Sequence, residues 1–216
     1  MNELNGQKPQ LIDVWASGAA YEAYVGRWSR LVASEFLTWL HAPSAARWLD
    51  AGCGTGALAE AILRSAAPSM VVGIDASIGF VPYVRGRTPD PHAHFLAADM
   101  QSLPFAAAAF DLAVSGLVLN FVADQRRAVA ELARVVRAGG VVAVYIWDYA
   151  GQMEFMRYFW DAAVALDPAA AALDEGPRFP ICAPGPLADL WQGAGLRDVQ
   201  VRAIDVPTVF RSFDDY

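Results

Sequence analysis

Apolar residues in the first part of the chain recur at helical spacing, three and four positions apart. Over residues 21–40 this spacing predicts one amphipathic helix. Its large apolar positions are Tyr24, Trp28, Leu31, Val32, Phe36, Trp39 and Leu40. Pro43 follows at once, and proline disfavours continuation of a helix. We therefore expect the helix to end there, just before the first strand.

Short apolar runs and helical segments then alternate. Strands are expected at residues 47–49, 70–74, 94–97, 110–115 and 141–147. Helices are expected after residue 56, over residues 79–87 despite Pro82, and from an Asp124 cap to residue 136, with Gly139 and Gly140 ending the last one. The run 141–147 is apolar throughout, which suits the centre of a parallel sheet. This alternation predicts an α/β fold with right-handed crossovers.

The pattern changes beyond residue 147. An aromatic segment at 149–160 and a short one at 186–195 are expected to be helical, with an alanine- and proline-rich stretch at 167–186 between them. Residues 199–205 alternate like a strand until Pro207 interrupts them. No internal repeat or long linker divides the 216 residues, so we expect one domain.

The segment LDAGCGTGAL, residues 49–58, places glycines at alternate positions between the first strand and its helix. Glycine is needed where a chain turns with positive φ, or where a ligand must approach the backbone. At the carboxyl end of a first strand this predicts a small-molecule site. Gly52, Gly54 and Ala57 also fit the dinucleotide pattern, with Asp75 at about the ~20-residue distance of a ribose-binding acid. The glycines alone therefore do not separate NAD from another adenosine cofactor.

Charge and cysteine content exclude several classes of protein. The net charge of −7 argues against a nucleic-acid partner, and Lys8 is the only lysine that lysine chemistry could use. The two cysteines, Cys53 and Cys182, have no metal-ligand spacing and suggest a reducing compartment. The first ten residues lack an apolar signal region, and no apolar run approaches the ~20 residues of a membrane span. We expect a cytoplasmic protein without a metal.

Three acids occupy equivalent positions in successive strands. Asp50, Asp75 and Asp99 each lie at or just past a strand's carboxyl end. A carboxylate there can accept paired hydrogen bonds from a ribose diol, or one from an exocyclic amine. The histidines are scattered, and no Ser/His/Asp or Cys/His arrangement is evident. No catalytic residue is therefore nominated.

Five segments, in order, resemble the class I S-adenosylmethionine (SAM) dependent methyltransferases, in the branch of ubiquinone/menaquinone biosynthesis and related small-molecule enzymes. They are LDAGCGTGAL (49–58), VVGIDAS (71–77), ADMQSLPF (98–105), FDLAVSGLVLNFV (110–122) and ELARVVRAGGVVAVYIWD (131–148). The resemblance implies a Rossmann-like, mostly parallel sheet with helices on both faces. It divides the single domain 1–216 into an N-terminal cap (1–45), a cofactor-binding core (46–148) and a substrate-side lid with the last strand (149–216).

The same resemblance implies a set of cofactor-binding residues. They are Tyr24, Arg27, Asp50, Ala51, Gly52, Gly54, Asp75, Ala76, Asp99, Met100, Ser115, Gly116 and Leu117. The glycine turn, with Asp50 behind it, would hold the methionine part of SAM. Asp75 would take the ribose hydroxyls, Asp99 the adenine amine, and residues 115–117 would lie under the sulfonium. Arg27, within an aromatic face, would clamp the carboxylate; the alternative is an exposed arginine that covers apolar surface with its stem.

A methyl acceptor would meet an apolar, aromatic pocket. Its expected residues are Asn120, Trp147, Tyr149, Met153, Met156 and Trp160, although aromatics at helical spacing are more often core. The implied reaction is in-line transfer of a methyl group from SAM to a small hydrophobic or aromatic acceptor, which leaves S-adenosylhomocysteine (SAH). Two alternatives stay open: an NAD(P)-dependent Rossmann oxidoreductase, and a SAM-binding module without catalysis.

The resemblance also implies a seventh, antiparallel strand for which residues 206–216 offer no pattern. The sheet would then keep an unpaired edge, which invites pairing with another chain. We expect one of three outcomes: the fifth and sixth strands pair directly, a partner completes the sheet as in a homodimer through the open edge, or the chain is a truncated form. Truncation is favoured.

Overall fold

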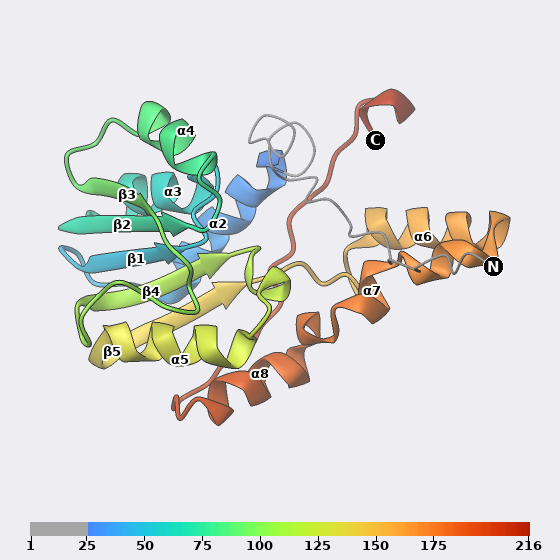
Figure 1. The fold of residues 1–216 in the computed structure, drawn as a ribbon. Helices are drawn as coiled ribbons and strands as arrows, with labels where there is room; N and C mark the ends of the chain where they lie inside the picture. Colours follow the sequence, from blue (N-terminus) through green and yellow to red (C-terminus); the bar gives the residue numbers. More distant parts are fainter. Residues whose placement is uncertain (1–25) are drawn as a thin grey trace, which may run out of the picture.

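A computed structural model describes residues 26–216, which form a five-stranded parallel sheet flanked by helices (Figure 1). The strand order is β3-β2-β1-β4-β5. The strands are β1 (Arg47–Ala51), β2 (Met70–Asp75), β3 (Ala93–Ala97), β4 (Phe110–Gly116) and β5 (Val136–Tyr145). The predicted α/β class and mostly parallel sheet are confirmed, and each of the first four strands lies within three residues of its predicted position.

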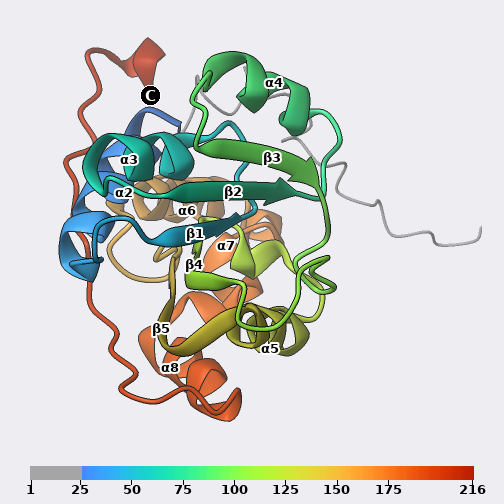
Figure 2. The same cartoon turned by 90° about the vertical axis from the view of Figure 1, so that its left-hand side faces the viewer.

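Helices cover both faces of this sheet. The helices of the described chain are α2 (Arg27–Leu40), α3 (Ala57–Ser65), α4 (Phe80–Arg87), α5 (Gln125–Val135), α6 (Glu154–Leu166), α7 (Glu175–Arg178) and α8 (Pro184–Gly193). Of these, α6 and α7 lie beyond the carboxyl ends of the strands and do not cover a face (Figure 1). Alternate side chains of β1 show the two-sided burial: Trp48 faces α2 and α3, and Leu49 faces α5 and α8. The view in Figure 2 separates these two layers of helices. This double burial explains why the strands are nearly continuous apolar runs.

The sheet order changes direction at β1, which places a crevice beside the glycine turn. The chain moves outward from β1 through β2 to β3, and then crosses back to the other side of β1 with β4. Open α/β sheets bind ligands at such a switch point, outside the carboxyl ends of the strands. The end of β1, where residues 52–56 turn into α3, is therefore the place that the fold offers for a ligand.

The boundary between α5 and β5 corrects one prediction. Asp124 caps α5 as expected, with its side chain accepting the Arg127 amide at 2.9 Å. Gly139 and Gly140 do not end the helix, because α5 stops at Val135 and β5 starts at Val136. Instead they lie inside β5, where the pairing with β4 shifts register, and a Cβ on Gly140 would lie 2.4 Å from the Asp111 carbonyl oxygen. Gly140 thus allows the two backbones to approach closely, and Gly139 supplies a φ of +73° beside it.

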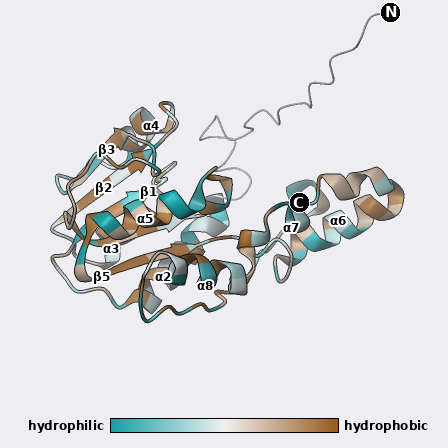
Figure 3. Cartoon of the chain, turned by 60° about the horizontal axis from the view of Figure 1, so that its bottom comes forward, coloured by the Kyte–Doolittle hydropathy of each residue, from teal (hydrophilic) through white to brown (hydrophobic). Residues whose placement is uncertain are grey.

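Two predictions about the last strands are wrong. The apolar run expected at the centre of the sheet belongs to β5, which within residues 26–216 is an edge strand paired with β4 alone. Figure 3 shows this hydrophobic strand at the border of the sheet. Residues 199–205 form no strand within the described chain, so the fifth and sixth strands do not pair directly. Val199 and Ile204 contact the cores on opposite faces of the sheet, whereas Val201 and Ala203 are exposed.

Residues 146–182 form a separate aromatic layer beyond the carboxyl ends of the strands (Figures 1 and 3). The predicted helix at 149–160 begins later, at Glu154, and is α6. Short turns follow: η4 (Pro168–Ala172), α7 and η5 (Pro180–Cys182); η3 (Leu119–Phe121) follows β4, and η6 (Phe213–Asp215) lies near residue 216. None of the helices in residues 26–216 is both long and apolar enough to cross a membrane.

Candidate active site

The glycine turn after β1 combines positive backbone angles with open space. Gly52, Gly54 and Gly56 have φ of +79°, +49° and +92°, a region that side chains with a Cβ rarely adopt. A Cβ on Gly52 would collide with Val118, so this glycine serves packing against the loop after β4. At Gly54, in contrast, no atom of the described chain beyond Gly54 and its two neighbours lies within 4 Å of a Cβ position. The backbone at Gly54 is therefore where a ligand can approach.

Asp75, at the end of β2, is directed at this turn. Its Oδ2 accepts the Gly54 amide at 2.9 Å, and its Oδ1 accepts the Ser77 amide at 2.8 Å. Each carboxylate oxygen keeps further acceptor capacity, because an ionised carboxylate has about four lone-pair sites. Asp75 can thus hold the turn and still accept hydrogen bonds from a diol. Ala76, the predicted neighbour of adenine, is exposed beside it.

Asp50 is a fully buried carboxyl group behind the turn. Its side chain is 0% exposed, and neither oxygen finds a hydrogen-bond partner of good geometry among residues 26–216. Burial, and then the negative charge of Asp75, raise the pKa of Asp50 to about 7, and the Ala59 amide offsets only part of this. A buried carboxyl without partners is costly. This edge of the sheet therefore favours a ligand that carries positive charge.

The end of β4 adds further buried polar atoms and a strained residue. The hydroxyl of Ser115 and both amide atoms of Asn120 are buried and lack partners within the part of the chain that the structure describes. Leu117 has a φ of +63°, which is rare for a residue with a large side chain. Its amide donates to the Tyr145 carbonyl at 2.8 Å, which holds this conformation, and a Cβ on Gly116 would collide with the Tyr145 hydroxyl. Strain together with unpartnered polar atoms is typical of functional sites.

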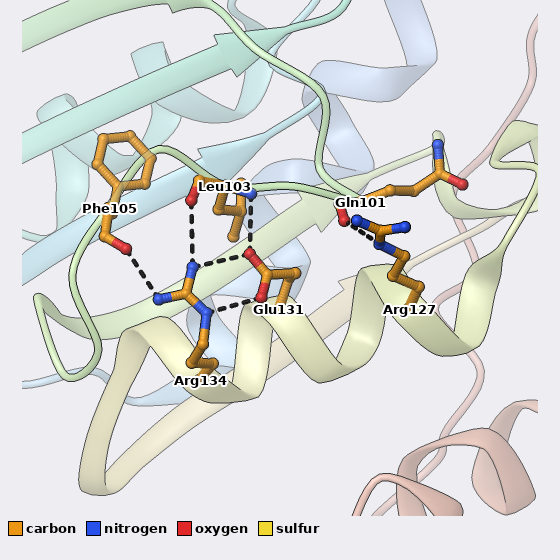
Figure 4. A network of polar contacts seen from close by, with 6 residues as sticks. All are labelled: Gln101, Leu103, Phe105, Arg127, Glu131 and Arg134. Carbon is orange, nitrogen blue, oxygen red and sulfur yellow. Dashed lines mark hydrogen bonds and ion pairs between the residues drawn. The ribbon is translucent and has the colours of Figure 1, made fainter.

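Asp99 and Met100 begin the loop after β3, on the other side of the turn. Asp99 is exposed and accepts the Gln101 amide at 2.8 Å, whereas Met100 is buried. The loop is fastened to α5 by the network in Figure 4. Glu131 accepts the Leu103 amide at 2.9 Å, and Arg134, paired with Glu131 at 2.6 Å, donates to the carbonyls of residues 103 and 105. The two residues predicted to meet adenine thus stand on a braced loop.

In the N-terminal part of the predicted site, Arg27 contacts other residues of the protein. Tyr24 lies outside the described residues. Arg27 donates from Nη1 to Asp215 Oδ1 at 2.8 Å, and its guanidinium carbon lies 4.2 Å from the Trp28 ring centroid. The carboxylate that Arg27 binds in this structure is therefore that of Asp215.

Apart from Asn120, which lies after β4, the predicted acceptor residues divide into two groups. Tyr149, Met156 and Trp160 pack in the aromatic layer with Trp28, and the Trp160 indole donates to Glu175. Trp147 and Met153 line a cavity of about 1190 Å³ between the free edge of β5 and residues 196–209. This cavity lies two strands away from the glycine turn, since β4 and β5 intervene. Packing accounts for the first group. Met153 also packs in this layer and is 8% exposed, so Trp147, which is half-buried, is the more accessible of the two cavity residues.

The comparison with protein families matches residues 49–144, which contain the glycine turn, Asp75 and the loop after β4, to the family described as "Methyltransferase domain". The chain carries a methyltransferase domain. SAM is the cofactor of this class of domain, and the geometry fits it. The open backbone at Gly54 and the two acids Asp50 and Asp75 suit a ligand that has a sulfonium, an amine and a ribose diol.

The curated proteins that are similar to this chain include an O-methyltransferase and a C-methyltransferase. The malonyl-[acyl-carrier protein] O-methyltransferase of Salmonella typhimurium is 37% identical over 130 residues, which are 60% of this chain and 50% of that protein. The ubiquinone/menaquinone biosynthesis C-methyltransferase UbiE of Desulfotalea psychrophila is 28% identical over 193 residues, covering 85% and 77%. The chain spans between 33% and 50% of the length of the malonyl-[acyl-carrier protein] methyltransferases compared with it.

Solved structures support the fold of the methyltransferase domain. A Haloferax volcanii protein, described as a putative methyltransferase in complex with the Trm112 methyltransferase activator, superposes with a TM-score of 0.66 at 19% identity, over 93% of this chain and 85% of that one. A SAM-dependent methyltransferase from Thermotoga maritima, described as a possible histamine N-methyltransferase, has a TM-score of 0.61 at 21% identity, over 82% and 74%. The backbone arrangement therefore agrees with the class I fold.

Several residues of the methyltransferase site were missing from the sequence-based set. Ser77 and Val118 complete the surroundings of the turn through a backbone amide and a packing contact. Glu131 and Arg134 brace the loop of Asp99, and their spacing of three on one helix was the only signal in the sequence. Cys53, inside the turn, is buried, and burial raises the pKa of its thiol far above the usual range. A thiol that stays protonated argues against a nucleophilic role for Cys53.

Proposed function

We propose that this protein transfers the methyl group of SAM to a small, largely apolar acceptor. The observation that carries the proposal is that the buried carboxyl of Asp50 lies behind the open glycine turn of a methyltransferase domain. A carboxyl that is 0% exposed and without good hydrogen bonds lies behind a backbone that nothing covers at Gly54. Such a site is incomplete without a ligand that brings positive charge and hydrogen-bond donors.

The cofactor assignment follows the strand ends. Asp50 and the backbone of residues 51–54 would hold the methionine part, and Asp75 the ribose hydroxyls, with Ala76 beside the adenine. Asp99 and Met100 would meet the adenine edge, and residues 115–117 would lie below the sulfonium. The network of Glu131 and Arg134 supports this assignment because it fixes the loop that carries Asp99.

The reaction requires little from acid–base groups. SAM supplies a methyl group on a sulfonium, which leaves as a neutral thioether. The protein has to align the acceptor with this methyl group and exclude water. Asn120, buried with both amide atoms unpartnered in the described chain, can donate to and accept from an acceptor at the end of β4. Leu117, held in a strained conformation beside it, would shape the apolar wall.

The acceptor would approach from the aromatic layer. Trp147 and Met153 line the cavity at the edge of β5, and Phe155 joins them from α6. Apolar walls with few polar groups suit a hydrophobic or aromatic molecule. Residues 149–216 would then act as the lid of the domain. Tyr149, Met156 and Trp160 would support it from the core of that layer.

The test begins with ligand binding. SAH is expected to raise the midpoint of thermal unfolding, whereas NADH is expected to leave it unchanged; stabilisation by NADH alone would favour the oxidoreductase alternative. Isotope-labelled SAM is then incubated with a cell extract, and methylated products are identified by mass spectrometry. The matched control is Asp75→Ala, which should form no labelled product. SAH binding without transfer to any acceptor would support the non-catalytic module.

The free edge of β5 also supports a homodimer as the proposed assembly. Its outer side has no strand partner within residues 26–216, and unpaired edges promote pairing between chains. Residues 196–209 lie across the cavity from this edge, so a pairing strand of a second chain would have to displace them. Light scattering coupled to size-exclusion chromatography measures the mass directly. Val142→Pro would remove a backbone donor in β5 and should reduce any dimer, whereas a monomeric wild type would contradict the assembly.

A further inference from the structure

Residues 196–216 run as a strap along the outside of the domain. Figures 1 and 2 show this segment leaving α8, passing the side of β5 and ending beside the start of α2. Residues 196–209 form one wall of the 1190 Å³ cavity, and β5 forms the opposite wall. No ladder joins the two walls in the described chain. The strap is therefore held on this side of the cavity by side-chain packing, as of Val199 and Ile204, and not by strand pairing.

One ion pair fastens the end of the strap to α2. Arg27, the first residue of α2, donates from Nη1 to Asp215 Oδ1 at 2.8 Å and from Nη2 to the Asp215 carbonyl at 3.1 Å. The other carboxylate oxygen of Asp215 accepts a hydrogen bond from the Arg211 amide at 2.9 Å, which is a contact within the strap. Both charged side chains remain about one-third exposed. Salt can therefore weaken this contact.

Aromatic contacts extend the same fastening to α6. Phe210 lies 5.0 Å from Trp28 and 5.8 Å from Phe155, measured between ring centroids, and its ring also lies 5.1 Å from the guanidinium of Arg27. The hydroxyl of Tyr216 donates to the Phe155 carbonyl. The strap thus joins the N-terminal ends of α2 and α6, and Phe155 is itself a cavity residue.

We propose that Arg27 and Asp215 form a clasp that keeps the strap closed over the cavity, so that a molecule enters when this ion pair opens. Val209 and Phe213 on either side of the clasp are 70% and 89% exposed, so the ion pair and the contacts of Phe210 and Tyr216 fasten this end of the strap. If the proposed function holds, the molecule that enters is the methyl acceptor; only this identification rests on the proposed function. The gating itself is a property of the cavity.

The test measures entry with the neutral fluorescent probe N-phenyl-1-naphthylamine, mixed rapidly with the intact protein. Asp215→Asn and Arg27→Met should each speed probe uptake by about 1.5- to 5-fold, the range for an exposed ion pair. The double variant should add little to the faster single variant, because both changes break one contact. Arg87→Gln, which removes an exposed arginine on α4, is the matched control and should not alter uptake.

The salt dependence of probe uptake tests the clasp without any substitution. Uptake by the wild type should accelerate as salt rises from low concentration, and uptake by Asp215→Asn should depend much less on salt. Unchanged uptake in both single variants, or strictly additive effects in the double variant, would overturn the clasp. SAH binding, measured in parallel, separates this result from the proposed function. A protein that fails to bind SAH can still show gated probe uptake.

Discussion

Asp75 Oδ2 accepts the amide of Gly54 at 2.9 Å, a bond between two residues 21 positions apart in the chain. The end of β2 thereby sets the shape of the turn after β1. From the sequence, Asp75 was predicted only to bind the cofactor; the structure shows that it also holds the glycine turn. Cofactor affinity and the geometry of the turn consequently depend on one carboxylate.

Replacing Asp75 separates its two tasks. Asp75→Ala removes charge-assisted hydrogen bonds worth about 1.5–3 kcal/mol each, so SAH affinity should fall at least about tenfold by isothermal titration calorimetry. Asp75→Asn keeps one carbonyl acceptor and should lose less. Normal affinity of Asp75→Ala would show that the end of β2 does not bind the cofactor.

Gly54→Val should abolish SAH binding while the protein remains folded. A β-branched side chain resists a φ of +49° and would fill the space where the backbone is open. Gly195, with a φ of +78° and equally open surroundings, is the matched control outside the site. Gly195→Val should lower the midpoint of thermal unfolding and leave affinity intact. If both variants bind SAH like the wild type, the opening at Gly54 has no role in binding.

The brace on α5 should influence the cofactor from a distance. Glu131→Gln weakens the acceptor for the Leu103 amide and the pair with Arg134, which should cost about 0.5–1.5 kcal/mol of unfolding free energy. Hydrogen exchange in residues 98–109 should accelerate, and SAH affinity should decrease severalfold. Arg126→Gln, on the exposed side of the same helix, is the control. Unaltered exchange in this loop would mean that the network does not hold it.

The local features of the site could be predicted because they depend on neighbouring residues. Glycines after an apolar run specify the turn, and an aspartate before a periodic segment specifies the cap of α5. Asp50, Asp75 and Asp99 follow from the strand ends for the same reason. Even the helix with Pro82 was identifiable, since proline in the first turn of α4 breaks no hydrogen bond.

Features set by distant contacts could not be predicted. The partner of Arg27 lies 188 residues away, and nothing near either residue indicates the pair. Residues 199–205 alternate like a strand, but a strand also needs a neighbour with which to bond, and β5 does not provide the ladder. The apolar run of β5 likewise indicates burial without indicating which element would cover it.

The pH dependence of stability should reveal the buried Asp50. Its pKa is raised to about 7 in the folded protein, whereas an aspartate in an unfolded chain titrates near 3.9. The folded state therefore holds a proton that the unfolded state releases, so the favourable contribution of neutral Asp50 is complete below about pH 4 and is lost as pH rises through 7. Asp50→Asn cannot ionise.

In urea titrations the stability of this variant relative to the wild type should rise by about 2.5 kcal/mol between pH 5 and pH 8, since the relevant change spans roughly two pH units at about 1.4 kcal/mol each. Asp161→Asn, an exposed position on α6, should show no such trend. Saturating SAM should shrink the difference at pH 8, because a positively charged ligand beside Asp50 favours its ionised form. If the difference in unfolding free energy between variant and wild type stays constant across this range, Asp50 does not have a raised pKa in the folded protein.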